Sequence, residues 1–164
     1  MYEEAFMRRA IAISAAALAT PGTEPFGAVV VRDGRIVGEG INRSLANLDP
    51  TSHGETEAIR DACRNLGTVD LAGCELYTSC EPCALCVAAM TIAGIARLYY
   101  AASMADAGAA FTGLTAAERH PIDPAHLRSE AGASIDERHL PAEQALPDEA
   151  VAVLAAWAAQ RRTA

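Results

Sequence analysis

The segment "EPCALC" constrains the fold most, because it places two cysteines three positions apart directly after a proline. Proline is favoured in the first turn of a helix, where its missing N–H costs nothing, so we predict that a helix begins at Pro82. Residues three apart lie on nearly the same helix face, which lets the sulfurs of Cys83 and Cys86 bind one ion. Two thiolates supply only half of a tetrahedral zinc site. The fold must therefore bring a further ligand to the start of this helix.

A third cysteine, Cys80, precedes the proline and belongs to the end of a predicted strand. It cannot share the helix face of the other two, and we expect it to be a buried packing residue. Taken alone, Cys83 and Cys86 could also be inert core residues. A structural zinc site of three cysteines and one histidine, closed by Cys80 and without activity, is the alternative from a different functional class.

The stretch "SHGE" begins a long helix predicted over residues 52–66, and it contains His53 and Glu55. At the first turn of a helix, His53 can project along the helix axis while Glu55 reaches past it. A catalytic zinc takes three protein ligands and leaves the fourth position to a water, whose pKa falls to roughly 7. His53, Cys83 and Cys86 satisfy that description. Glu55 is then the nearby carboxylate that can act as a general acid and base.

Charge and cysteine content narrow the classes of function. The chain has 164 residues, a formal net charge of −8, and 13 basic residues that are all arginines scattered along its length. Polyanion binding depends on basic side chains that displace counterions from phosphates, so nucleic acid is a disfavoured partner. No apolar stretch is long enough to cross a membrane. The five cysteines suit metal binding or burial better than a secreted disulfide framework, which predicts a cytoplasmic protein.

The order of predicted elements indicates one domain over residues 1–164. A helix over 3–19 precedes a hairpin that turns at Asp33-Gly34, and the 52–66 helix follows. The strands "CELYTS" and "IARLYYAA" then flank the cysteine helix, and "DEAVAVLAAWAAQRR" predicts a closing helix. Prolines interrupt residues 118–147, where we expect one further short strand. The predicted fold class is α/β, a three-layer α/β/α sandwich with a mixed five-stranded sheet.

The two motifs together resemble a known signature. His53-Gly54-Glu55 with Pro82-Cys83-Ala84-Leu85-Cys86 is similar to the H-x-E…P-C-x-x-C pattern of the cytidine-deaminase-like zinc deaminases. The segments "PFGAVVV", "DPTSHGETEAIR", "LYTSCEPCALC" and "YYAASMADAGAAF" also follow the order found in bacterial guanine deaminases and tRNA adenosine deaminases. The resemblance is firm over residues 3–111. It implies a cytidine deaminase-like fold, a bound Zn²⁺, and hydrolysis in which zinc-activated water replaces an exocyclic amine.

The resemblance also assigns roles to single residues. It implies that Glu55 protonates the ring nitrogen and the departing ammonia, that Asn42 hydrogen-bonds the base, that Phe26 stacks or packs beside it, and that Asp106 lies near the substrate. The ordinary alternatives are a turn residue for Asn42, a core residue for Phe26 and a capping carboxylate for Asp106. Gly54 stands where the family usually has alanine, and we expect no effect because this position faces away from the metal.

We predict that the chain deaminates a free nucleobase or related amino-heterocycle, with guanine to xanthine plus ammonia as the first candidate. Deamination of tRNA adenosine, or of cytosine or a triazine, would keep the same chemistry. The segments "VAAMTIAGIARL" and "QRRTA" lack aromatic residues that guanine deaminases often carry, which leaves the substrate open. The resemblance further implies a homodimer that exchanges residues 112–164 between subunits.

Overall fold

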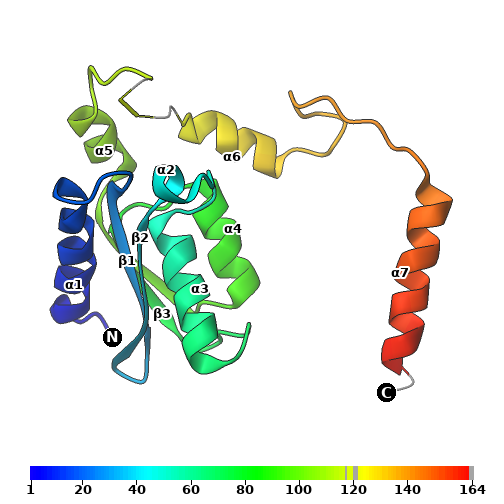
Figure 1. Ribbon diagram of the computed structural model, residues 1–164, viewed down its shortest axis with the longest axis horizontal. Helices are drawn as coiled ribbons and strands as arrows, with labels where there is room; N and C mark the ends of the chain where they lie inside the picture. Colours follow the sequence, from blue (N-terminus) through cyan, green and yellow to red (C-terminus); the bar gives the residue numbers. More distant parts are fainter. Residues whose placement is uncertain (117, 120–121, 163–164) are drawn as a thin grey trace. The chain divides into compact units, whose positions relative to one another are not determined.

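The computed structural model describes residues 1–116, 118–119 and 122–162. The chain forms two compact units, one that ends at Arg128 and one that begins at Ser129. The elements follow in the order α1 (Glu4–Ala15), a 3-10 helix (Ala16–Leu18), β1 (Glu24–Arg32), β2 (Arg35–Asn42), α2 (Ser44–Asn47), α3 (Gly54–Leu66), β3 (Glu75–Cys80), α4 (Ala84–Ala93), β4 (Arg97–Ala102), α5 (Met104–Ala110), α6 (Pro124–Gly132) and α7 (Pro147–Arg162) (Figure 1).

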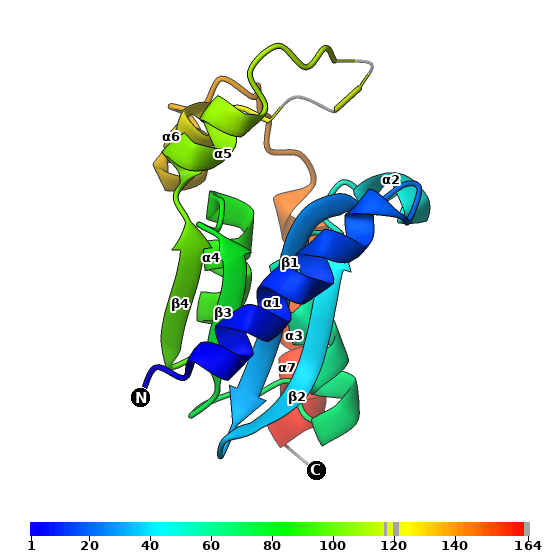
Figure 2. The same cartoon turned by 90° about the vertical axis from the view of Figure 1, so that its left-hand side faces the viewer.

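The first unit is built on a mixed sheet of four strands in the order β2-β1-β3-β4 (Figure 2). Strand β1 pairs antiparallel with β2 and with β3, whereas β3 and β4 are parallel. The β1–β2 hairpin turns at Asp33 and Gly34, whose φ angles of 50° and 70° are the left-handed conformations that such a two-residue turn requires. The predicted hairpin is therefore confirmed.

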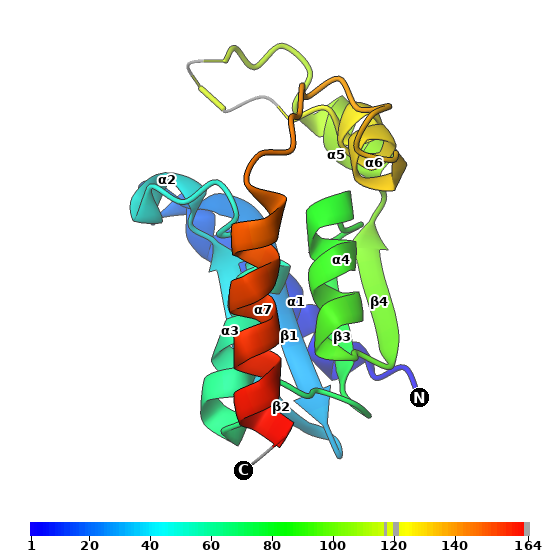
Figure 3. The ribbon, with the colours of Figure 1, turned by 90° about the vertical axis from the view of Figure 1, so that its right-hand side faces the viewer.

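Helices cover both faces of this sheet, with α1 on one face and α3 and α4 on the other (Figures 1 and 3). The central strand β1 is buried on both faces, and its side chains alternate between them. Ala28 and Val30 pack with buried residues of α3 and α4, whereas Val29 and Val31 pack with those of α1. This arrangement agrees with the predicted α/β/α layers.

The prediction of a fifth strand is wrong, because the sheet has four strands within the residues that the structure describes. The described part of residues 118–147 contains α6, turns and irregular chain instead. Pro124 and Pro147 open α6 and α7, at positions where a missing N–H costs nothing. Prolines cannot donate to a strand ladder, so a segment with this proline spacing has little to gain as a strand.

Helix α3 approaches the sheet closely at three glycines. A Cβ built on Gly40 would lie 2.2 Å from the carbonyl oxygen of Gly54, and one on Gly38 would lie 2.4 Å from that of Ala58. A Cβ on Gly54 would lie 2.3 Å from the carbonyl oxygen of Phe26 in β1. The missing side chain of Gly54 allows the start of α3 to touch β1. The expectation that glycine at this position has no effect on the metal site stays a prediction.

The second unit contains the predicted closing helix, which is confirmed as α7. Acidic side chains lie in its first turn and arginines in its last, which complements the helix dipole. Its apolar residues Val151, Leu154 and Trp157 are 58%, 68% and 59% exposed. Throughout the described part of the chain, no helix is both long enough and apolar enough to cross a membrane.

Candidate active site

Three side chains meet at the N-terminal ends of α3 and α4. His53 immediately precedes α3 and Cys83 immediately precedes α4, both with extended backbone, and Cys86 lies in the first turn of α4. The Nδ1 atom of His53 lies 3.5 Å from each of the two sulfurs, which are 3.8 Å apart. Helix α4 begins two residues later than predicted, so Pro82 precedes it. The two cysteines still face the same point.

These separations fit one tetrahedral zinc ion. Zn–S bonds of about 2.3 Å and Zn–N bonds of about 2.0–2.1 Å place two sulfurs about 3.8 Å apart and a sulfur and a nitrogen about 3.5 Å apart. The hydrogen bond from Cys86 and that from His53 lower the pKa of the Cys83 thiol to about 4, against the effect of burial. The pair therefore carries a thiolate before any metal binds, as a zinc ligand set requires. His53, Cys83 and Cys86 leave the fourth position to a ligand from outside the protein.

Cys80 lies outside this ligand set. Its thiol is 3.9 Å from the carbonyl oxygen of Ser103, and it does not belong to the group formed by His53, Cys83 and Cys86. Burial raises the pKa of the Cys80 thiol. The geometry thus disfavours a structural site of three cysteines and one histidine.

Glu55, the second residue of α3, lies beside the ligand set and is 5% exposed. Its Oε1 accepts a hydrogen bond of 3.2 Å from the hydroxyl of Thr78, and its Oε2 lies 3.4 Å from the sulfur of Cys86. Burial raises the pKa of Glu55 above the ordinary value of a carboxyl. A raised pKa makes the carboxyl hold a proton more readily than an ordinary one, which suits a general acid and base.

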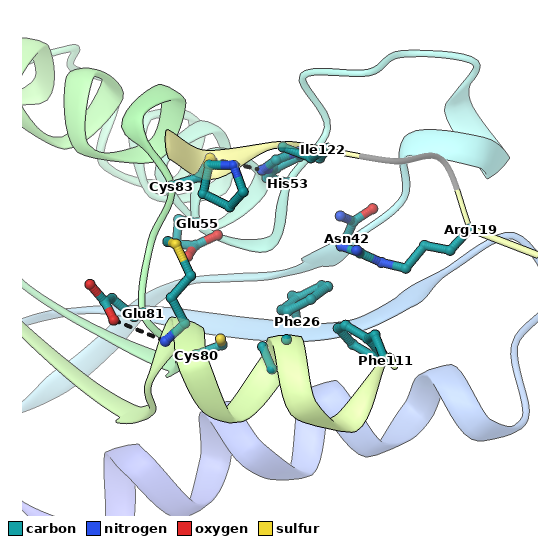
Figure 4. Close-up of a pocket in the computed structure, with 14 residues that line it drawn as sticks. Phe26, Asn42, His53, Glu55, Cys80, Glu81, Cys83, Phe111, Arg119 and Ile122 are labelled. Atoms are coloured by element: carbon teal, nitrogen blue, oxygen red, sulfur yellow. Dashed lines mark hydrogen bonds between the residues drawn. The ribbon is translucent and has the colours of Figure 1, made fainter. Parts of the chain in front are cut away.

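A cavity of about 190 Å³ opens in front of these residues (Figure 4). Its walls come from the ends of β1, β2 and β3, from α5 and from the chain that follows α5. Pockets for drug-sized ligands measure about 300–1,000 Å³, so this cavity suits a smaller molecule such as a single heterocyclic base. His53, Glu55 and Cys83 line it together with two predicted substrate contacts, Asn42 and Phe26.

The amide of Asn42 is oriented by its neighbour in the chain. The side chain lies at the end of β2 and is 4% exposed, and its Oδ1 accepts a hydrogen bond of 3.0 Å from the backbone N–H of Ser44. This contact leaves the Nδ2 group of Asn42 to donate toward the cavity. Asn42 therefore presents a hydrogen-bond donor to whatever occupies the site.

Asp106 does not line the cavity. Its carboxylate accepts hydrogen bonds from the backbone N–H and the hydroxyl of Ser103, at 2.9 Å and 2.6 Å, in the capping box of α5. These hydrogen bonds lower the pKa of Asp106. The capping alternative accounts for these contacts, and a substrate contact for Asp106 stays a prediction.

Four residues at the site were not predicted, namely Thr78, Glu81, Phe111 and Arg119. Thr78 holds Glu55, while Glu81 lines the cavity and accepts a hydrogen bond of 2.9 Å from the backbone N–H of Met104. Phe111 could have been found, because it ends the matching segment "MADAGAAF". Arg119 lies in a weakly patterned region, and no local motif indicates it.

Residues 1–102 match the family described as the cytidine and deoxycytidylate deaminase zinc-binding region. The match covers more than half of the chain and includes the whole ligand set. The chain therefore belongs to this family of zinc-dependent hydrolytic deaminases. The predicted family, cofactor and reaction type are confirmed.

Individual relatives extend the similarity beyond the zinc-binding region. The guanine deaminase of Bacillus subtilis (strain 168) is 36% identical over 157 residues, which cover 96% of this chain and 94% of that protein. An X-ray structure of guanine deaminase from Bacillus subtilis has the same coverage and identity with a TM-score of 0.81. The tRNA-specific adenosine deaminase of Agrobacterium fabrum is 44% identical over 90 residues, which cover 55% of this chain and 59% of that protein.

Proposed function

We propose that the chain hydrolyses guanine to xanthine and releases ammonia. The observation that carries this proposal is the meeting of His53, Cys83, Cys86 and the buried Glu55 at a cavity of single-base size. Similarity to a guanine deaminase over 96% of the chain supports guanine as the base. A zinc ion held by the three ligands supplies a water whose pKa is lowered to roughly 7, which makes hydrolysis feasible near neutral pH.

We assign the proton transfers to Glu55. Its carboxylate takes the first proton of the water on attack at C2 of guanine and delivers it to the ring nitrogen N3. It then takes the second proton, from the hydroxyl now on C2, and delivers it to the amine, which leaves as ammonia while the C2 carbonyl forms. The hydrogen bond from Thr78 holds one carboxylate oxygen, which limits rotation of the group and keeps the other oxygen toward the ligand set. Glu55 thus needs no further acid or base to complete the reaction.

The base is bound by donors and by an aromatic wall. The Nδ2 group of Asn42 donates to an acceptor of the base, and the ring of Phe26 packs beside it. Phe26 is itself held by Phe111, at a centroid separation of 5.8 Å with an edge-to-face angle of 69°. This packing fixes the width of the slot that the planar base enters.

A second candidate substrate is tRNA adenosine, which the 44% identity to a tRNA-specific adenosine deaminase favours. The net charge of −8 opposes it, because a polyanion would meet an acidic protein. Cytosine and amino-triazines share the reactive amidine group and stay as further candidates.

We also propose a cytoplasmic homodimer in which residues 112–164 are exchanged between subunits. The apolar side chains that α7 exposes support this arrangement, since a helix normally buries such residues against a partner. Five free cysteines support a reducing compartment. Light scattering on the purified chain should give twice the monomer mass, and Trp157→Glu should shift it toward the monomer. A monomeric wild-type chain would rule the dimer out.

The function is tested by measuring ammonia release from guanine, guanosine, adenine, cytosine, amino-triazines and an adenosine-bearing tRNA anticodon loop. We expect guanine to have the largest kcat/KM, and a Glu55→Gln variant to keep its zinc while losing turnover. A different substrate with a kcat/KM above that of guanine would replace guanine in the assignment. Steeply salt-dependent binding of tRNA would instead support the second candidate.

A further inference from the structure

Arg119 is the one arginine or lysine among the described residues that line the cavity, and the mechanism above does not use it. Figure 4 shows Arg119 and Asn42 entering the cavity from one side, with Cys83 and Glu55 on the other. The guanidinium group lies 4.6 Å from the centroid of the Phe111 ring and is also stacked over Phe26.

The guanidinium group is held in this position by a second kind of contact. Its Nε atom donates a hydrogen bond of 2.9 Å to Glu24 at the start of β1, and the two side chains are only 23% and 14% exposed. The ion pair uses one of the five N–H donors of the guanidinium, and the aromatic contacts use its flat face. In the described part of the chain, no other acceptor binds the two terminal nitrogens of Arg119. Their N–H groups are therefore available to a ligand.

This side of the cavity consequently presents hydrogen-bond donors, from Arg119 and from the Nδ2 group of Asn42. When the C2 amine of guanine faces Glu55, its O6 and N7 atoms lie on the far side of the rings. Both atoms are acceptors, and the planar fork of arginine binds this O6/N7 pair in the commonest base-specific contact to guanine. The donors of the protein and the acceptors of the base therefore match.

We propose that Arg119 determines specificity by donating to the O6/N7 edge of a 6-oxopurine and thereby rejecting purines that carry an amine at C6. The inference rests on the guanine deaminase activity proposed above. A 6-amino group would direct its N–H toward the N–H groups of Arg119, so donors would face donors and the guanidinium would lose an acceptor inside the cavity. Sites that are built to hydrogen-bond a substrate group reject analogues that lack it far more strongly than apolar pockets reject a change in size.

The test compares guanine with 2,6-diaminopurine, which keeps the C2 amine and N7 but has an amine at C6. We would measure kcat/KM for guanine and the inhibition constant of 2,6-diaminopurine in the wild type, Arg119→Gln and Arg119→Lys. Arg64→Gln is the matched control, because this side chain on α3 is 67% exposed and lies outside the cavity. Thermal unfolding and zinc content of each variant report on folding.

We expect Arg119→Gln to lower kcat/KM for guanine roughly 10- to 100-fold while the binding of 2,6-diaminopurine stays within about threefold or tightens, because the glutamine amide can also accept. Arg119→Lys keeps the charge beside Glu24 but loses the fork, so it should lose most of the preference for guanine. Arg64→Gln should match the wild type.

If Arg119→Gln weakened the binding of 2,6-diaminopurine by the same factor as it lowered kcat/KM for guanine, Arg119 would only complete the cavity wall. This result would overturn the inference. An Arg119→Lys variant that kept the wild-type preference for guanine over 2,6-diaminopurine would overturn the inference as well. Absence of guanine turnover in the folded, zinc-loaded wild type would instead overturn the proposed function. In that event, equilibrium binding of guanine and 2,6-diaminopurine to the wild type and Arg119→Gln still decides the role of Arg119.

Discussion

Replacing Gly40 by alanine tests whether the close approach of α3 to β2 positions the catalytic groups. The new Cβ would lie 2.2 Å from the carbonyl oxygen of Gly54 and 2.3 Å from the backbone nitrogen of Ala58, whereas ordinary contacts begin at 3.4 Å. The first turn of α3 must therefore retreat by about 1 Å. Overpacking of this kind costs about 1–3 kcal/mol of unfolding free energy. A displacement of about 1 Å at the reacting groups costs about 10²-fold in rate, because His53 and Glu55 move with the helix start.

Urea unfolding measures the free energy of unfolding of the Gly40→Ala variant, and ammonia release and zinc content measure its activity. Gly38→Ala is the comparison, because its Cβ meets Ala58 at 2.4 Å but lies farther from the start of α3. It should lose similar stability and less than about tenfold of activity. A Cβ on Gly132 would meet no atom within 4 Å, so Gly132→Ala should leave the free energy of unfolding and the activity unchanged. A Gly40→Ala variant that is destabilised yet keeps wild-type kcat would refute the positioning role.

Three further predictions concern single contacts at the site. Thr78→Val removes the hydrogen bond to Glu55 and should lower kcat about 3- to 30-fold with zinc content unchanged. Thr78→Ser keeps the hydroxyl and should stay near the wild type. Equal values of kcat in the two variants would contradict a role for this hydrogen bond. Cys80→Ser should retain a full complement of zinc in a metal assay and Cys86→Ser should lose it, whereas loss of zinc from Cys80→Ser would revive the structural-site alternative. Asp106→Ala should lower the melting temperature by removing the cap of α5 without changing KM for guanine, and a raised KM would restore its predicted substrate contact.

Short-range patterns in the sequence were sufficient to predict most of the zinc site. The spacing of Cys83 and Cys86 after Pro82 specifies a helix start with two sulfurs on one side, since helical periodicity is local. The same pattern excludes Cys80, which the structure leaves outside the ligand set. His53 is thirty positions away from Cys83; its place at a helix start made it a candidate ligand, the resemblance to a zinc deaminase supported the pairing, and the fold brought the two motifs together.

Contacts between distant segments were decided by the tertiary structure alone. Thr78 belongs to a buried strand and Arg119 to a weakly patterned loop, and nothing local distinguishes either from a packing or surface residue. The predicted fifth strand failed because the prolines of this segment cannot donate to a strand ladder and because strand formation also depends on a partner edge. Gly54 is a further case, because a Cβ at this position would lie 2.3 Å from the carbonyl oxygen of Phe26 and no pattern in the sequence indicates this contact. Sequence spacing determined which atoms can bind the metal, and packing decided what surrounds them.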